Sequence, residues 1–378
     1  MQNRAKKRIK LWLAHRAWRP LLLAGVAVFV LTEIVALSPS SIEEGNNASS
    51  MIEPDTLIPK EQMDTVIVGI PKGVIPDYRV EKFEYLSSQG AEKQWKLLAD
   101  TAAMYHKGKE DLTHAIKVNA NLYDPDGKIT IVTGREAKYV STGRDLEIYG
   151  DVVTTFPDGF QLQSDYLRYT PNNKKIEIPE KYFVKGTGKE GKDSNLSFQS
   201  QGLDYAMGRS YIILPKDAVV TMAKIKTAPD PDHPDAPLPK DNTTTIKSDR
   251  CEIDRTKQIA HFTMYASRPL KDRFVHILQP TLYARGRRAE LNYGDQGSML
   301  NYLTAYEDVF IRDTSSVEQA KYATGGRADF DNQHNLIILT LFPQVYQDED
   351  TVTGDKILMH RDTDMVDIDN SNSFSQGN

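Results

Sequence analysis

The chain has 378 residues, a formal net charge of −5 and 39% hydrophobic residues. This apolar share excludes a polytopic membrane protein and favours a thin architecture over one large globule. The single cysteine, Cys251, excludes a disulfide scaffold, a zinc finger and an iron–sulfur site. Seven of the 47 basic residues and none of the 52 acidic residues lie within residues 1–19, so the remainder is acidic and unlike a nucleic-acid binder.

An apolar segment, Pro20–Leu37, follows the basic N-terminus. As a helix it would be about 27 Å long, near the thickness of a bilayer core. The sequence predicts a transmembrane anchor with its basic flank in the cytoplasm and the rest of the chain translocated. A cleaved signal peptide is the alternative, although the segment is long for one and has no clean A-x-A site. The expected anchor residues are Leu21, Leu22, Leu23, Val28, Phe29 and Glu33.

The exported part divides by composition. Residues 38–78 are rich in Ser, Pro, Asn and acidic residues, which predicts a tether. Short alternating strands are predicted over residues 79–226 (the first block) and again over residues 243–370 (the second block). Residues 227–242 are proline-rich and form a linker or an insertion. Residues 371–378 are predicted to be a disordered tail.

A loose repeat occurs in both blocks: a short alternating segment, a polar turn, and a second alternating strand that ends near a valine. Leu167-x-Tyr169 followed by Ile176-x-Ile178 is one example, and Ala328-x-Phe330 followed by Leu336-x-Ile338 is another. Such self-similarity is typical of a stacked array, and an ordinary meander sandwich is the alternative. Residues 91–106 fit a helical stripe and a strand equally well, so periodicity does not decide there.

Motifs of enzyme chemistry are missing from the sequence. Gly186-x-Gly188-x-x-Gly191 matches the dinucleotide fingerprint by letters, but no apolar helix follows it, so a flexible hairpin tip is predicted. The eight histidines form no pair with metal-ligand spacing. A β-solenoid enzyme could still assemble paired carboxylates from distant strands, and it stays as an alternative.

Several short motifs occur in an order shared with a known family. In the first block they are Phe83-Glu-Tyr85, Trp95-Lys-Leu97, Leu122-Tyr123, Ala137-x-Tyr139, Leu146-x-Ile148-x-Gly150 and Leu203-x-Tyr205. With the anchor and the tether, this order resembles LptC of the lipopolysaccharide-transport periplasmic family. In the second block, Ile246-x-Ser248-Asp249, Gly325-x-x-Ala328-x-Phe330 and Gly354-Asp355-Lys356-Ile357 resemble its LptA/OstA-like members. The chain is then a long LptC or a joined LptC–LptA bridge.

The resemblance implies an all-β fold: OstA-like β-jellyrolls of stacked antiparallel strands, preceded by one N-terminal transmembrane helix. It assigns residues 94–106 to strands. Because each acyl CH₂ exposed to water costs about 0.8 kcal/mol, the lipid needs an apolar groove across an aqueous space. The expected groove residues are Ile129, Ile131, Leu146, Ile148, Leu162, Leu167, Tyr169, Ile176, Leu203, Tyr205, Ile212, Leu214, Phe262, Met264, Leu291, Tyr293, Phe330 and Ile338.

The resemblance also implies the function: a non-enzymatic periplasmic component of lipopolysaccharide export, without cofactor or metal. It would be a single-pass inner-membrane protein with a cytoplasmic N-terminus, would receive lipopolysaccharide from an ABC transporter, and would pass its acyl chains toward the outer membrane. Unpaired edge strands would bind the transporter at one end and a downstream bridge protein or outer-membrane receptor at the other. The expected edge residues are Phe83, Tyr85, Trp95 and Leu97, and then Lys356, Ile357 and Ile368.

Two other functions fit the same sequence. A membrane-anchored β-solenoid enzyme acting on cell-envelope glycans would bring two or three carboxylates together on one face. A structural spacer would have a closed, dry core, because the predicted groove residues would pack only against each other.

Overall fold

The computed structural model describes residues 75–107, 110–124, 126–190, 194–224, 243–292, 302–314, 320–331, 334–347, 350–361, 363, 365–370 and 372–375. These residues all belong to one unit, Ile58–Asn378. They form 24 antiparallel strands and three short 3₁₀ turns, so the all-β, jellyroll-like fold predicted from the resemblance is confirmed for this part of the chain.

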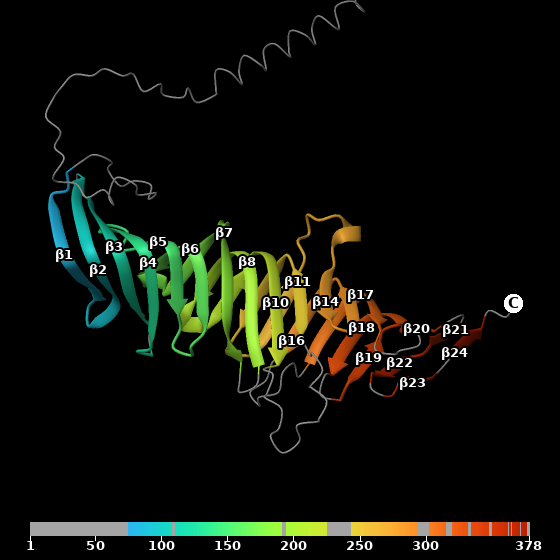
Figure 1. The fold of residues 1–378 in the computed structure, drawn as a ribbon. Coiled ribbons are helices and arrows are strands. Elements are labelled where there is room, and N and C mark those ends of the chain that lie inside the picture. Colours follow the sequence, from blue (N-terminus) through green and yellow to red (C-terminus); the bar gives the residue numbers. More distant parts are fainter. Residues whose placement is uncertain are drawn as a thin grey trace, which may run out of the picture. The chain divides into compact units, whose positions relative to one another are not determined.

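The strands follow one another along the chain, from β1 (blue) to β24 (red) in Figure 1. The first ten are β1 (Tyr78–Gln89), β2 (Glu92–Lys107), β3 (Glu110–Tyr123), β4 (Ile129–Val140), β5 (Leu146–Thr155), β6 (Gln161–Thr170), β7 (Lys175–Glu190), β8 (Ser194–Ala206), β9 (Tyr211–Leu214) and β10 (Lys216–Lys224). Turns η1 (Pro171–Asn173) and η2 (Met207–Arg209) connect β6 to β7 and β8 to β9.

The second half of the stack has shorter strands and one further turn, η3 (Leu270–Asp272). The strands are β11 (Thr244–Ser248), β12 (Arg250–Asp254), β13 (Ile259–Thr263), β14 (Val275–Gln279), β15 (Leu282–Gly286), β16 (Arg288–Asn292), β17 (Tyr302–Asp313), β18 (Lys321–Asp331), β19 (Leu336–Thr340), β20 (Gln344–Gln347), β21 (Asp350–Thr353), β22 (Lys356–His360), β23 (Val366–Asp369) and β24 (Asn372–Ser375).

The strand pairings define two faces of a sandwich. Face A contains β9, β12, β13, β16, β19, β22 and β23, and face B contains β10, β11, β14, β15, β20, β21 and β24. The long strands β1–β8, β17 and β18 bend and contribute one half to each face. In β17, for example, Tyr302 pairs with Asn292 of β16 on face A, whereas Phe310 pairs with Arg285 of β15 on face B.

The bends lie along one side of the sandwich, which we call the corner edge. Most of the long strands shift register at the bend, and several residues there have a positive φ angle, as at a β-bulge. Hairpin turns occupy the opposite side, which we call the open edge. Within the described residues, the backbone therefore joins face A to face B at the corner edge, whereas the links across the open edge are made through side chains. The positive-φ corner residues include Lys82, Lys117, Gly150, Asp151, Gly202, Asp217, Glu307, Asp308, Leu341, Phe342 and Asn370.

The two blocks are joined by hydrogen-bonded strands on both faces. On face B, β10 pairs with β11, with Val220 opposite Ile246. On face A, β9 pairs with β12, with Ile212 opposite Ile253. Both ladders therefore continue from the first block into the second without a break.

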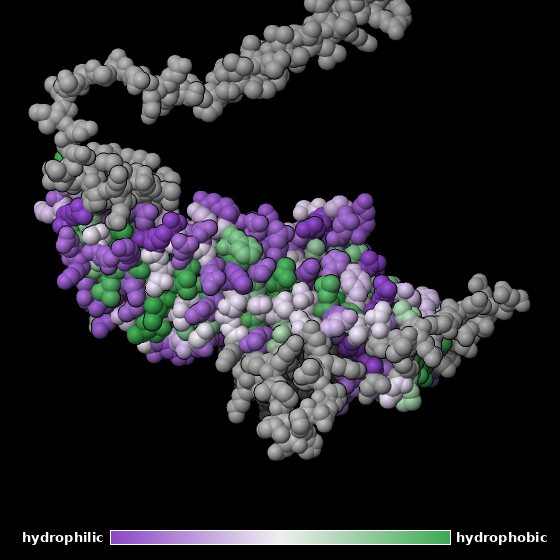
Figure 2. Space-filling view, in the orientation of Figure 1, coloured by the Kyte–Doolittle hydropathy of each residue, from purple (hydrophilic) through white to green (hydrophobic). Residues whose placement is uncertain are grey.

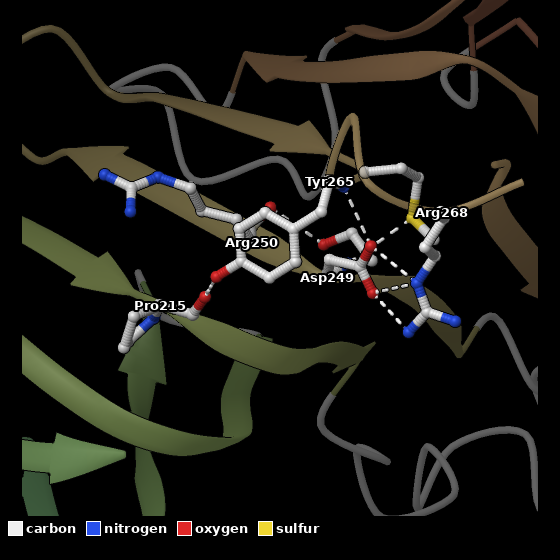
Figure 3. Close-up of polar contacts among 7 residues, drawn as sticks. Pro215, Asp249, Arg250, Tyr265 and Arg268 are labelled. Atoms are coloured by element: carbon white, nitrogen blue, oxygen red, sulfur yellow. Dashed lines mark hydrogen bonds and ion pairs between the residues drawn. The ribbon is translucent and has the colours of Figure 1, made fainter.

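A buried polar network holds the corner edge at this junction (Figure 3). The carboxylate of Asp249, 3% exposed, lies between β11 and β12 and accepts hydrogen bonds from Arg268 Nε at 2.7 Å and from the Tyr265 amide at 2.8 Å. The Tyr265 hydroxyl donates to the carbonyl of Pro215, between β9 and β10. One loop thus ties together the two points at which the chain passes between the faces.

The sequence-based assignments at the two ends of the chain have different outcomes. Residues 94–106 lie within strand β2, as the resemblance predicted. The disordered tail predicted for residues 371–378 is wrong over Asn372–Ser375, which pair with β21 as strand β24. The predicted anchor, the tether up to residue 74 and the linker from residue 227 lie outside the described residues. Within the described residues, no helix has the length and hydropathy needed to cross a membrane.

We predict that Asp249→Asn lowers the free energy of unfolding by about 2–3 kcal/mol, because it weakens a buried, charge-assisted network. Urea denaturation followed by circular dichroism measures the change. The matched control is Asp151→Asn, which removes a carboxylate of the same edge whose ion pair with Arg135 is exposed. This control should change stability by less than about 0.5 kcal/mol. Equal losses in the two variants would contradict the role of Asp249.

Candidate functional site

The interior between the two faces is apolar and continuous. On face A, inward side chains follow one another on paired strands, from Leu146 through Tyr169 and Ile176 to Tyr205 and Ile212, each at most 8% exposed. One cluster of contacting buried residues extends from Phe83 on β1 to Met359 on β22 and includes both blocks. On the side shown in Figure 2, the surface is mostly hydrophilic, with hydrophobic residues in separate patches. The candidate site is therefore this interior.

Most of the residues predicted to face a groove do face the interior. Met264 is partly buried and packs against the same cluster, and Tyr293 lies outside the described residues. The buried ones, all at most 8% exposed, are Leu146, Ile148, Leu162, Leu167, Tyr169, Ile176, Leu203, Tyr205, Ile212, Leu214, Phe262, Leu291 and Phe330.

Three groove assignments were wrong in orientation. Ile129 and Ile131 are 42% and 41% exposed and point outward from β4, because Thr130 and Val132 occupy the inward positions opposite Leu122 and Ala120. Ile338 is half-buried on the outer side of β19, and its neighbours Ile337 and Leu339 point inward. In both strands the alternation was taken one residue out of phase.

Sequence analysis also missed part of the interior. The missed residues come mainly from face B. There, single inward residues have polar neighbours, and the sequence shows no long alternation of apolar and polar residues. Val220, Ile246 and Ile277 are the clearest case, because they connect the blocks on paired strands. The missed side chains include Phe156, Phe160, Phe198 and Ile311, each at most 8% exposed.

Side chains fill the interior in this structure. Gly186 lies in β7, and a Cβ atom added there would be 2.5 Å from the ring of Phe198. A Cβ atom on Gly188 would overlap the ring of Phe160. The glycines predicted to form a hairpin tip are therefore positions at which the missing side chain makes room for an aromatic ring.

Aromatic rings from the two faces meet near the open edge of the first block. Tyr139 of face A lies 5.0 Å from Trp95 and 5.3 Å from Tyr85 of face B, between ring centroids. Farther along, Tyr205 of face A makes an edge-on contact with Phe156 at 5.2 Å. In the described part of the chain, no backbone–backbone hydrogen bond joins the two faces beside these rings.

The interior also contains polar atoms without a hydrogen-bond partner among the described residues: Trp95 Nε1, Ser164 Oγ and the Tyr169 hydroxyl. An unmatched buried polar group costs about 1–3 kcal/mol. Burial raises the pKa of the Tyr169 hydroxyl and of the Cys251 thiol, so both stay neutral at physiological pH. Among the described residues, no group of three His, Cys, Asp or Glu side chains has the geometry to hold a metal ion.

The strands predicted as partner edges are placed differently by the structure. Within the described residues β1 pairs with β2 alone, so Phe83 and Tyr85 lie on a terminal strand. Trp95 and Leu97 lie on β2, which pairs on both sides with β1 and β3, and their side chains point into the interior. At the other end, Lys356 and Ile357 lie on β22, which is also paired on both sides, by β19 and β23. Ile368 lies on β23, a terminal strand of the described part.

Comparisons with known proteins give two family matches, one in each block. Residues 70–192 match the family of lipopolysaccharide-assembly, LptC-related proteins. Residues 240–365 match the family of LptA/(LptD N-terminal domain) lipopolysaccharide-transport proteins. The solved structures include LptH of Pseudomonas aeruginosa, described as an LptA-homologous periplasmic component, with 15% identity and a TM-score of 0.31. That match covers 35% of this chain and 95% of LptH. No curated protein sequence matches the chain.

We predict that Gly186→Ala destabilises the fold by about 1–3 kcal/mol, because the new methyl group would overlap the ring of Phe198. Thermal unfolding followed by circular dichroism measures the effect. Gly143→Ala is the matched control, since an added Cβ atom there meets no atom within 4 Å. Unchanged stability of the Gly186 variant would mean that the interior has spare room at this position.

Proposed function

Because the chain is a lipopolysaccharide-transport family protein with an LptC-related and an LptA-like part, we propose that it carries lipopolysaccharide across the periplasm as one continuous conduit. The acyl chains occupy the interior between faces A and B, and the sugar part remains in water along the open edge. Each CH₂ kept out of water contributes about 0.8 kcal/mol, which makes a continuous apolar path the main requirement for such transport.

The observation that carries this proposal is the unbroken interior at the junction of the blocks. Val220 and Ile246 on face B, and Ile212 and Ile253 on face A, are buried and directly paired across the junction. A lipid tail that enters the first block can therefore pass into the second without contact with water. A second copy or a separate protein is not needed at this point of the path.

Entry of the tails requires the two faces to move apart. Since the faces share backbone at the corner edge and side-chain contacts at the open edge, separation at the open edge costs no strand hydrogen bonds. Acyl chains then replace the ring contacts of Tyr139, Trp95, Tyr205 and Phe156 with apolar contacts of similar kind. The tails enter laterally along the open edge and need not be threaded from one end.

The cellular context proposed for the chain is that of an inner-membrane-anchored LptC. An anchor within Pro20–Leu37 holds the N-terminus in the cytoplasm, and an ABC transporter delivers lipopolysaccharide to the first block. The outer backbone groups of β1, which pair with no other described strand, bind the transporter, and those of β23 and β24 bind a downstream bridge protein or outer-membrane receptor. A cytoplasmic ATPase supplies the energy.

We predict that a photoreactive amino acid at Ile148, Tyr205 or Phe330 crosslinks to lipopolysaccharide in living cells, because all three side chains point into the interior. The matched control is Ile131, an isoleucine of the first block that points outward. Immunoblotting for lipopolysaccharide detects the adducts, which should be absent at Ile131 and lost when ATP is depleted.

The pattern of adducts also separates the alternatives. Adducts at Ile148 and Tyr205 without an adduct at Phe330 would make the second block a docking module. Of the alternative functions, the filled interior favours a structural spacer with a dry core. That spacer would give no adduct at any interior position.

We predict that removal of residues 1–37, with export restored by a cleavable signal, releases the protein into the soluble periplasmic fraction. Regulation of the transporter through Glu33 of the anchor is a further part of this hypothesis. Cell fractionation measures the first effect, and the ATPase activity of the reconstituted transporter measures the second. Retention in the membrane fraction would contradict the anchor, and unchanged ATPase activity would contradict the regulation.

A further inference from the structure

Three basic side chains cross the open edge from face A to face B. Each lies in a hairpin turn of face A: Lys174 between β6 and β7, Arg255 between β12 and β13, and Arg361 between β22 and β23. Lys174 Nζ donates to the carbonyl of Tyr123 at 3.2 Å. Arg255 forms an ion pair with Asp158 in the turn between β5 and β6. These contacts, together with those of Arg361, link the faces at the open edge, where no backbone of the described ranges connects them.

Arg361 makes the most extensive of these links. Its guanidinium donates to Gln279 Oε1 at 2.9 Å and to Thr281 Oγ1 at 3.1 Å, both at the turn between β14 and β15. Its Nε lies 3.6 Å from a carboxylate oxygen of Asp313, at the end of β17. The side chains of Arg361 and Asp313 are 15% and 4% exposed, so water screens this contact little.

The partners of the three cations on face B differ in charge: Arg255 and Arg361 each lie beside a carboxylate, and Lys174 donates to a neutral group. The acceptor of Lys174 is a neutral carbonyl oxygen. Arg361 donates its hydrogen bonds to a neutral amide and a neutral hydroxyl, and its Nε lies 3.6 Å from the Asp313 carboxylate. The buried Nε–H of Arg361 has no hydrogen-bond acceptor within the described part of the chain. At Arg255, burial would raise the pKa of Asp158, but the hydrogen bonds from Arg255 and from the Phe160 amide lower it overall, so this pair remains charged.

An amphiphile whose tails lie in the interior must leave its headgroup at the open edge. Separation of the faces would break the three cross-edge contacts and leave one ammonium and two guanidinium groups at that edge. A phosphate monoester carries up to two negative charges and accepts paired hydrogen bonds from arginine. It therefore compensates Lys174 better than a carbonyl does, and it can take the place of the Asp158 and Asp313 carboxylates beside the two arginines.

We propose that Lys174, Arg255 and Arg361 form a series of binding sites for the phosphate groups of the lipid headgroup. In the empty protein these side chains hold the open edge closed, and in the loaded protein they exchange their partners on face B for phosphate oxygens. This inference rests on the proposed function, because it requires that lipid tails enter the interior.

The spacing along face A makes the three positions separate sites. Four strands, β7, β8, β9 and β12, lie between Lys174 and Arg255, and six strands, β13, β16, β17, β18, β19 and β22, lie between Arg255 and Arg361. At about 4.8 Å for each strand, these intervals are roughly 19 Å and roughly 29 Å. A phosphate group would therefore leave one cation before it reaches the next, which divides the path into steps.

Binding of two lipids with identical tails tests the inference on the full-length protein in lipid nanodiscs. One probe is lipid A with both phosphates, and the other is the same lipid after both phosphates are removed. The wild type should bind the phosphorylated lipid about tenfold more tightly, as charge-assisted hydrogen bonds to phosphate predict. The triple variant Lys174→Gln, Arg255→Gln, Arg361→Gln should lose this preference and keep its affinity for the dephosphorylated lipid.

Two further variants control for charge and folding. Arg135→Gln removes a positive charge that pairs with Asp151 at the corner edge, and it should keep the preference of the wild type. The double variant Arg255→Lys, Arg361→Lys keeps the charges and should retain most of the preference. A triple variant that still prefers the phosphorylated lipid would overturn the inference, and so would a wild type without any preference. If the wild type bound neither lipid, the proposed function would fail and the inference with it.

Discussion

The two faces of this protein share continuous backbone along the corner edge, whereas side-chain contacts hold them together along the open edge. The rest of the structure depends on this asymmetry. Bulges and positive-φ residues fold each long strand at the corner edge, so the faces cannot separate there without the loss of strand pairing. At the open edge, ring contacts and a few polar links can be exchanged for contacts with a ligand. A filled interior is therefore compatible with lipid carriage, since the same apolar surfaces can pack against each other or against acyl chains.

The junction between the blocks joins the two segments that match families into one continuous apolar interior. Both ladders continue through it, and Asp249, Arg268 and Tyr265 fix the corner at the point where the chain changes faces twice. If the two blocks were separate proteins paired strand to strand, the fraction of joined molecules would depend on their concentration. Here the covalent connection makes it permanent, because pairing within one chain does not carry the entropic cost of association.

The alternation of apolar and polar residues in the sequence predicts much of the interior correctly. Where this prediction is wrong, the error has a physical cause. Leu146 and Ile148 lie in a strand with clear alternation and were placed correctly. In β4 a register shift after Thr133 leaves only a few residues to set the phase, and the inward positions include the polar Thr130, so Ile129 and Ile131 were misassigned. The continuous apolar run at residues 336–339 carries no phase information at all. The cross-edge cations were not predictable, because Arg361, Gln279 and Asp313 are far apart in sequence and meet only through the topology.

The separation of the faces can be measured most directly as distances between spin labels on outer positions, before and after lipid binding. Ile131 on face B with Glu177 on face A reports on the first block, and Tyr322 on face B with Ile338 on face A reports on the second. The native Cys251 is fully buried and its thiol pKa is raised, so it should remain unlabelled. The account predicts that both distances lengthen when lipopolysaccharide binds. Distances that stay the same in a lipid-loaded protein would contradict entry through the open edge.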